Sequence, residues 1–152
     1  MQYRRSRAKG AAFFFTVVTH GRRRFLCDEA SIALIREAFQ QVINRHPFTV
    51  EAFVLLPDHL HGACKGDQLA ARPVPGKQAI WQHRFWEHQI RDENDFVNHV
   101  EYIHFNPVKH GLAISPAAWP HSTFHRFVKQ EIYLGDWGAE KEIDFEQDVG
   151  NE

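Results

Sequence analysis

The sequence has little cysteine, no long hydrophobic run and no internal repeat. Cys27 and Cys64 are the two cysteines among 152 residues, too few for a disulfide framework and without the spacing of a zinc or redox motif. No apolar stretch approaches the roughly 20 residues of a membrane-spanning helix. A basic stretch before the apolar residues 11–18 imitates a secretory signal, but three arginines at 22–24 follow instead of a small-residue cleavage site. We therefore expect a cytoplasmic protein without membrane association.

The composition is that of a folded domain. Hydrophobic residues make up 43% and aromatic residues 13% of the chain, which argues against a disordered protein. A chain of this length can bury enough surface for a core without disulfides, and a single domain is the first expectation. We expect that domain over residues 1–138, beginning with a basic arm, and an acidic tail over residues 139–152.

The formal net charge of −1 conceals two regions of opposite charge. Residues 1–130 contain 17 lysines and arginines against 11 acids, whereas residues 131–152 contain one lysine and eight acids. The first 24 residues hold seven basic side chains and no acid. A basic body indicates a polyanionic partner, although ordinary surface charge would explain the same counts. Eleven histidines make metal or phosphate chemistry worth testing.

Hydrophobic patterning predicts a sheet. Residues 11–19 and 48–56 are rich in aromatic and β-branched side chains and predict strands, of which the first is buried on both faces. The Pro57-Asp58 turn then predicts a hairpin with a third strand over residues 59–65. Residues 80–90 are expected to be extended in part.

Helices are expected between and after these strands. Asp28 is positioned to cap a helix over residues 29–45, with one apolar stripe at helical spacing: Ile32, Ile35, Phe39, Val42 and Ile43. Asp92 caps a second helix, which we expect to end near residue 105 because Pro107 disfavours helical geometry at the preceding residue. The remaining assignments are a loop over residues 66–79 and a short helix from Ser122 or Thr123 to Val128. The fold class is α+β, a central antiparallel sheet with helices packed on it.

His59 and His61 form the first candidate site. Side chains alternate along a strand, so both imidazoles point to one face while Leu60 faces the core on the other. Two adjacent imidazoles provide half of a divalent-metal site, and a strand leaving a core holds them rigidly. Two surface histidines on a solvated strand face are the alternative.

Tyr102 and Asn106 form the second candidate site. They lie four residues apart in the second helix, on a face shared with three further polar residues: Asp95, Asn98 and His99. The opposite face is apolar and is expected to contact the core through Phe96, Val100 and Ile103. On the polar face the tyrosine hydroxyl is available as a nucleophile, and the Asn106 side-chain oxygen is available as a third metal ligand. Alternatively, Tyr102 lies at the core edge and Asn106 caps the helix end.

Several motifs follow one another in a fixed order. Residues 55–61 are LLPDHLH, residues 102–108 are YIHFNPV, and Gly111-Leu112 comes next. Shorter matching segments are Tyr3-Arg-Arg, Phe13–Thr16, residues 81–86 and Trp119–Ser122. Together they resemble the single-tyrosine HUH transposase superfamily, most of all the REP-associated tyrosine transposases. The resemblance covers about residues 3–138 and implies an HUH domain there, a ferredoxin-like palm-type sandwich.

The resemblance also implies residue roles. His59 and His61 would bind Mg²⁺ or Mn²⁺, with Asn106 as a further ligand. Tyr102 would attack a DNA phosphodiester, giving a 5′-phosphotyrosine intermediate and a free 3′-hydroxyl. Attack by another 3′-hydroxyl would rejoin the strand without an external energy source. Imidazoles are softer ligands than Mg²⁺ prefers, which favours Mn²⁺ in vitro.

The implied partner is a single-stranded DNA hairpin with a short guide sequence beside its foot. Phosphate contacts are expected from basic residues in two groups. These are Arg4, Arg5, Arg7 and Lys9 in the arm, and Arg22, Arg23 and Arg24 after the first strand. The aromatic residues over 81–86 either stack on unpaired bases or pack in the core. No small-molecule substrate is implied, and the protein is expected to be a monomer or a homodimer.

The segment over residues 62–80 is shorter than the family usually has between the His-x-His strand and Trp81. This departure leaves a catalytically impaired DNA-binding relative as the second interpretation. A zinc hydrolase is a third, but the sequence has no HExxH motif and no third histidine at a persuasive spacing.

Overall fold

The computed structural model describes residues 11–66, 80–82, 85–139 and 145. Four strands form one antiparallel sheet in the order β2-β3-β1-β4. The strands are β1 (Ala12–Val18), β2 (Phe48–Leu55), β3 (His59–Gly66) and β4 (Trp86–Gln89). The helices are α1 (Glu29–Arg45), α2 (Glu93–Lys109) and α3 (Phe124–Lys129), with short 3-10 turns η1 (His20–Arg22) and η2 (Pro116–Ala118). The expected fold class is confirmed.

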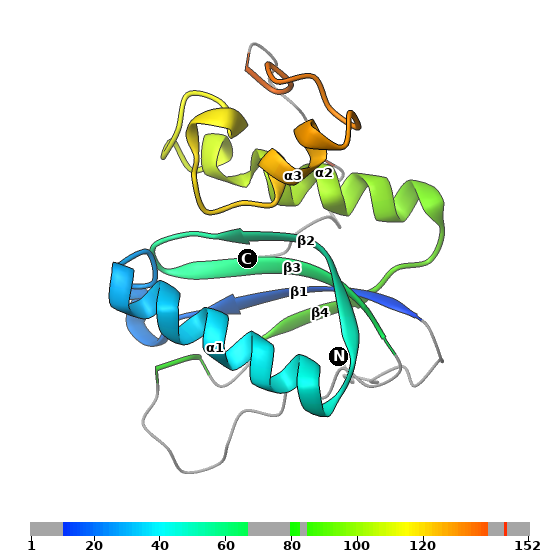
Figure 1. Cartoon of the computed structure of the whole chain (residues 1–152). Helices are drawn as coiled ribbons and strands as arrows, with labels where there is room; N and C mark the ends of the chain where they lie inside the picture. The colour runs from blue at the N-terminus through cyan, green and yellow to red at the C-terminus, as the bar shows by residue number, and fades with distance from the viewer. Residues whose placement is uncertain (1–10, 67–79, 83–84, 140–144, 146–152) are drawn as a thin grey trace.

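The sheet is the middle of three layers, with α1 on one face and α2 and α3 on the other (Figure 1). Strand alternation explains the layers, because successive side chains point to opposite faces. Towards α1, Leu55 and Leu60 pack with Leu26 and with half-buried residues of the helix. Towards α2, Phe14 and Val54 pack against buried residues of that helix. The core is therefore two apolar layers separated by the sheet.

Helix α1 begins and ends where its sequence predicts. Its apolar stripe packs against β2, since the Phe39 ring lies near Phe48 and Phe53 of that strand, with ring centroids 6.5 and 5.3 Å apart. The stripe is less buried than its pattern suggests, and Val42 is 47% exposed. Asp28 stands at the N-cap position, but its exposed carboxylate makes no capping hydrogen bond within the described residues. Water can satisfy the first helical N–H groups at such an exposed end.

Helix α2 begins as expected and ends later than expected. The Asp92 carboxylate accepts a 2.8 Å hydrogen bond from the Asp95 backbone N–H, which caps the helix. The prediction of an end near residue 105 was wrong, because α2 runs to Lys109 with Pro107 inside it. The effect of proline on its predecessor is a bias, and here the residues around the proline are packed: Asn106 and Pro107 are buried, and Phe105 lies beside Gly138. Packing outweighs the local preference.

Of the remaining expectations, the short last helix is confirmed, and several others concern residues that the structure does not describe. Helix α3 starts after Thr123, and the Phe124 N–H donates to Ser122 Oγ at 3.1 Å. The basic arm up to Lys9, most of the loop assigned to residues 66–79 and nearly all of the acidic tail lie outside the described residues. In the part of the chain that the structure describes, no helix is both long and apolar enough to cross a membrane.

Candidate functional site

His59 and His61 lie on the face of β3 that α2 covers, and both are buried, with 2% and 0% of their surface exposed. Leu60 points to the opposite face and packs in the α1 layer. The predicted alternation is confirmed, and the alternative of two solvated surface histidines was wrong. The two imidazole rings lie edge to face with centroids 5.0 Å apart.

Each imidazole is oriented through Nδ1. His61 Nδ1 lies 2.7 Å from the hydroxyl of Thr16, its partner across the β1–β3 ladder. His59 Nδ1 lies 2.7 Å from the carboxylate of Asp58, the residue before it. When Nδ1–H donates to such a group, the lone pair of Nε2 is available to a ligand, an arrangement common around metal-binding histidines. The donor set therefore fits a divalent metal.

Asp58 links this site to the basic residues that follow β1, Arg22, Arg23 and Arg24. Its carboxylate also lies 3.6 Å from the guanidinium of Arg22 in η1. Burial acts to raise the pKa of Asp58, but the hydrogen bond and charge of His59, followed by the charge of Arg22, outweigh it and hold that pKa below its usual value. The carboxylate is therefore ionised at neutral pH and suited to accept a hydrogen bond from the Nδ1–H of His59.

Three residues follow one another at a spacing of four along one side of α2: Tyr102 and Asn106 in the helix, and His110 at its C-cap. The Tyr102 ring lies edge to face with His61, with centroids 5.3 Å apart. The His110 ring lies edge to face with His59 at 4.9 Å. Asn106 stands between Tyr102 and His110 in the sequence, four residues from each, and its side chain is buried. The structure thus brings Tyr102 to His61 and His61 to His59, and it buries Asn106 one helical turn after Tyr102.

Tyr102 is more deeply buried than the polar pattern of its helix face predicts. Only 1% of its surface is exposed, and its ring also contacts Phe14 and Phe145 at 6.1 and 5.3 Å. The expectation of an open polar face was wrong, because this face of α2 lies directly on the sheet. The hydroxyl nevertheless reaches a polar neighbour, since the ammonium of exposed Lys109 donates to it at 2.8 Å.

A second polar cluster lies one turn earlier on α2. Ligand atoms of His88, Asp95 and His99 lie within 4.8 Å of one another. The Asp95 carboxylate accepts hydrogen bonds from Arg91 and lies 2.7 Å from His88 Nε2. Burial acts to raise the pKa of Asp95, but Arg91 and then His88 lower it well below its usual value. The guanidinium already balances this carboxylate, so the cluster primarily joins β4 to the start of α2.

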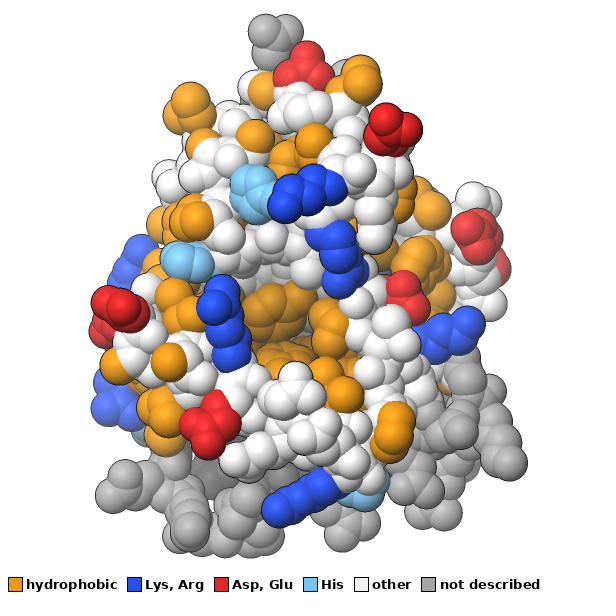
Figure 2. Space-filling view, viewed as in Figure 1, with side chains coloured by type: hydrophobic (Ala, Val, Ile, Leu, Met, Phe, Trp, Pro, Cys, Tyr) orange, Lys and Arg blue, Asp and Glu red, His pale blue; other side chains and the backbone are white. Residues whose placement is uncertain are grey.

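The basic residues predicted to contact DNA are placed only in part. Arg22, Arg23 and Arg24 are exposed and follow β1 directly, next to the Asp58 turn. Arg4, Arg5, Arg7 and Lys9 lie outside the described residues. Figure 2 shows lysine and arginine side chains around a hollow with a hydrophobic floor, with acidic side chains between them. The face drawn in Figure 2 therefore carries both positive and negative side chains around this hollow.

The aromatic residues over 81–86 contribute to packing. Trp81 packs beside the Leu26, Leu55 and Leu60 cluster. The Trp86 ring lies edge to face with Phe14 at 5.3 Å. This favours the core-packing interpretation of these residues over base stacking.

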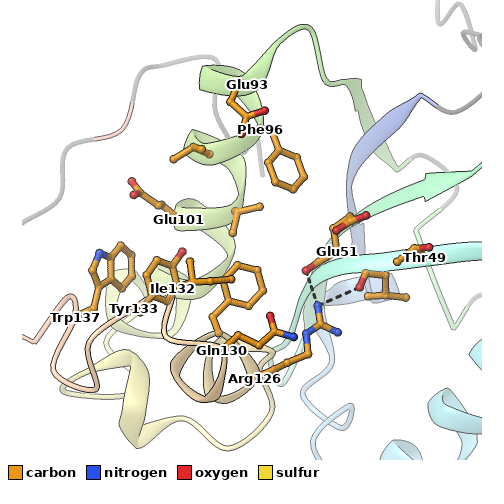
Figure 3. A pocket seen from close by; sticks show the side chains of 14 residues that line it. Thr49, Glu51, Glu93, Phe96, Glu101, Arg126, Gln130, Ile132, Tyr133 and Trp137 are labelled. Carbon is orange, nitrogen blue, oxygen red and sulfur yellow. Dashed lines mark hydrogen bonds between the residues drawn. The ribbon is translucent and has the colours of Figure 1, made fainter.

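A separate cavity of about 750 Å³ lies on the side of α2 opposite Tyr102. Its walls come from the start of β2, from α2, from α3 and from the turns after α3, with Phe96, Tyr133 and Trp137 among the aromatic residues (Figure 3). Arg126 closes one side by donating to the carbonyl oxygens of Val50 and Glu51 at 3.1 and 2.6 Å. The cavity is separated from the two histidines by the body of the helix.

Sequence reasoning missed four residues that touch the predicted site: Thr16, Asp58, Lys109 and His110. Two of them carry a signal that could have been found, because Lys109 and His110 follow Tyr102 by seven and eight residues and so return to its side of the helix. Asp58 was assigned only to the turn. Thr16 becomes a neighbour of His61 only through the pairing of β1 with β3.

Known proteins similar to this chain share one description. No protein-family model matches it. A Haemophilus influenzae protein named as a REP-associated tyrosine transposase is 38% identical, over 97% of this chain and 98% of its own length. The REP-associated tyrosine transposase of Escherichia coli is 38% identical, over 91% and 92%. A solved structure of a REP-associated tyrosine transposase bound to a REP hairpin has a TM-score of 0.84 and 38% identity, and the match covers 100% of this chain and 98% of that one.

The alignment with the Haemophilus influenzae protein spans 175 positions, more than the 152 residues of this chain. That relative therefore carries residues inside the aligned region that this chain lacks.

Proposed function

The chain belongs to the REP-associated tyrosine transposases, and on that premise we propose that it cleaves and rejoins single-stranded hairpin DNA through Tyr102. The observation that carries the proposal is the position of Tyr102. Tyr102 lies one turn before Asn106 on α2. Its ring centroid lies 5.3 Å from that of His61, and its hydroxyl accepts a hydrogen bond from the Lys109 ammonium. A tyrosine that only filled the core would not need this set of polar neighbours.

A divalent metal is the cofactor that the site would take. His59 and His61 would supply Nε2, with Nδ1 directed to Asp58 and Thr16, and Asn106 would supply its side-chain oxygen. When bound, Mg²⁺ or Mn²⁺ withdraws charge from a non-bridging phosphate oxygen and lowers the barrier to attack at phosphorus. Two nitrogen ligands favour Mn²⁺ over Mg²⁺.

The residues of the chain would carry out a transesterification. The Tyr102 oxygen attacks phosphorus, the bond from phosphorus to the 3′-oxygen breaks, and the 5′-phosphate remains on the tyrosine. The phenol gives up one proton and the 3′-oxygen takes one up, so the step releases and consumes protons in equal number. In the second step a 3′-hydroxyl attacks the phosphotyrosine and Tyr102 leaves as the phenol. The number of phosphodiester bonds is conserved, so no nucleotide cofactor is required.

The test is the formation of a covalent adduct with a single-stranded hairpin in Mn²⁺. We expect the wild-type protein to form an SDS-stable adduct and Tyr102→Phe to form none, while hairpin affinity stays within about threefold because the ring and its contacts are retained. Tyr133→Phe is the matched control, since it removes the same atom from a tyrosine that lines the separate cavity. Cleavage that persists in Tyr102→Phe would show that water or another residue is the nucleophile.

Hairpin binding would rest on the basic residues of the arm and of the segment after β1. Neutralising Arg4, Arg5 and Arg7 together should make the dependence of the logarithm of affinity on the logarithm of salt shallower by about 2, because each phosphate contact on a single strand releases about 0.7 counterion. An unchanged salt dependence would show that the arm does not contact phosphate.

A catalytically impaired DNA-binding protein is the second candidate, favoured by the extra residues of the Haemophilus influenzae relative. The same assay separates the two candidates. Hairpin binding with no adduct in the wild-type protein would support the impaired protein, whereas an adduct that depends on Tyr102 would exclude it.

A further inference from the structure

Lys109 contacts the predicted nucleophile in two ways. Its ammonium donates a hydrogen bond of 2.8 Å to the Tyr102 hydroxyl oxygen. The same ammonium lies 4.8 Å from the centroid of the Tyr102 ring. Both residues belong to α2 and lie seven residues apart, so the lysine side chain runs back along two helical turns to reach the tyrosine.

This conformation is unusual for a lysine at the end of a helix. Lys109 is the last residue of α2 and is exposed, where the carbonyl groups of the final turn and bulk water both attract an ammonium. Ordering a lysine side chain also costs up to about 2 kcal/mol of rotamer entropy. A charge-assisted hydrogen bond and a cation–π contact on one partner offset that cost.

We propose that Lys109 is a catalytic residue of the strand-transfer reaction and acts on the Tyr102 oxygen. This inference rests on the function proposed above. Negative charge develops on that oxygen as the phenolic proton is lost, and an ammonium donor already in place stabilises the charge without further reorganisation. Lys109 keeps its own protons throughout, and the bonds that form and break are those between phosphorus and the two oxygens.

The same contact serves both directions of the reaction. During rejoining, the bond between phosphorus and the Tyr102 oxygen breaks and charge returns to that oxygen. A donor at this position stabilises the departing oxygen as it stabilised the attacking one. Removal of the ammonium should therefore slow cleavage and rejoining by similar factors.

The competing role for a lysine at this position is a salt-dependent contact with the DNA backbone. That role predicts weaker hairpin binding with an unchanged rate of reaction once the hairpin is saturating. The catalytic role predicts the reverse. The two are separated by measuring the dissociation constant and the single-turnover rate independently.

The experiment compares Lys109→Met, Lys109→Arg and the matched control Lys129→Met, which removes an exposed lysine from the end of α3. The measurements are hairpin dissociation constants, single-turnover adduct formation at saturating hairpin in Mn²⁺, and urea unfolding as a check of folding. Lys109→Met should reduce the rate constant by about 100-fold or more, as removal of one preorganised donor does. Its hairpin affinity should stay within about threefold, because the proposed contact is to protein and not to DNA.

Lys109→Arg should recover most of the rate, since a guanidinium can donate to the same oxygen, and Lys129→Met should behave as wild type. An adduct that forms at the wild-type rate in Lys109→Met overturns the inference and leaves the proposed function intact. A loss confined to affinity also overturns it and makes Lys109 a phosphate contact. If the wild-type protein forms no adduct, both the proposed function and this inference are overturned.

Discussion

The two faces of the sheet are built from alternate residues of the same strands, yet they bury different chemistry. Under α1 the contacts are apolar, and α1 itself has no fully buried residue among its 17, all within the described part of the chain. Under α2, a helix of the same length, nine helix residues are buried. Five of these carry polar groups: Asp95, His99, Tyr102 and Asn106, and also His104, which contacts Thr123 and Tyr133 on the α3 side of the helix.

The α1 face of the sheet therefore contributes to stability by apolar contact, whereas the α2 face also holds the polar groups of the candidate site. A buried polar group destabilises a protein unless it is hydrogen-bonded, and on the α2 face the partners are present: Thr16 for His61, Asp58 for His59, and Arg91 and His88 for Asp95. The α1 face needs no such partners, because it stabilises the sheet by apolar contact. One strand therefore carries site residues and core residues at successive positions.

The largest expected effect comes from removing the histidines. His59→Ala with His61→Ala should lower the rate of adduct formation by about 1,000-fold or more, because the proposed metal would no longer be held to stabilise charge at phosphorus. Single-turnover cleavage in Mn²⁺ measures it. Excess Mn²⁺ should restore part of the activity of His61→Ala alone and none of that of Tyr102→Phe. Full activity in the double variant would show that the two histidines on the α2 face are not needed for cleavage.

Leu60→Ala tests the residue between the two histidines. Leu60 is 5% exposed, and its truncation should lower the free energy of unfolding by about 2–5 kcal/mol. Cleavage per folded molecule should remain within about threefold of wild type, since the residue faces α1 and makes no contribution to the charge at phosphorus. Urea unfolding and active-site titration measure the two quantities.

The control for this prediction is Leu34→Ala in α1, where the side chain is 66% exposed. Its effect on the free energy of unfolding should be within about 0.5 kcal/mol. If Leu60→Ala instead lost its activity while remaining folded, the α1 face would contribute directly to the site.

Thr16→Val tests how the α2 face positions its ligands. The change retains the shape of the side chain and removes the hydroxyl that holds His61 Nδ1 at 2.7 Å. Loss of such a partner typically reduces metal affinity or activity by about 10–100-fold. Titration of cleavage with Mn²⁺ should show a higher metal requirement. Thr49→Val makes the same chemical change at an exposed position of β2 and should leave the titration unchanged.

The smallest effect concerns pH and His104. Burial, followed by the charges of Arg126 and His125, lowers the pKa of His104 to about 3. The unfolded chain therefore binds a proton below about pH 6.5 that the folded protein does not, and stability falls as the pH drops from there towards 3. The contribution is up to about 1.4 kcal/mol per pH unit.

His104→Gln removes this titrating group, so the free energy of unfolding should depend less steeply on pH between 6.5 and 5 than in the wild-type protein. Urea unfolding at several pH values measures the difference between the two slopes. Parallel slopes would show that His104 is protonated equally in the folded and unfolded states, and that the contact between α2 and α3 tolerates a buried charge at this position.

The sequence alone determined the strands, the helix starts, and which polar residues share one face of a strand or a helix. Alternation at His59, Leu60 and His61 needs no tertiary information, because the period of a strand is two. Helical spacing likewise placed Tyr102 and Asn106 on one side of α2. The motifs in their order also indicated the family, which the curated relatives confirm.

The tertiary structure decided what those patterns leave open. Spacing places residues on a face but does not say whether that face meets solvent or a sheet, so the burial of Tyr102 could not be predicted. The pairing of β1 with β3 brought Thr16 to His61 across 45 residues of sequence. Packing of the last turn carried α2 past Pro107 and so brought Lys109 to the Tyr102 oxygen. Each of these depends on contacts between segments distant in sequence, whereas periodicity reports only the local geometry of one segment.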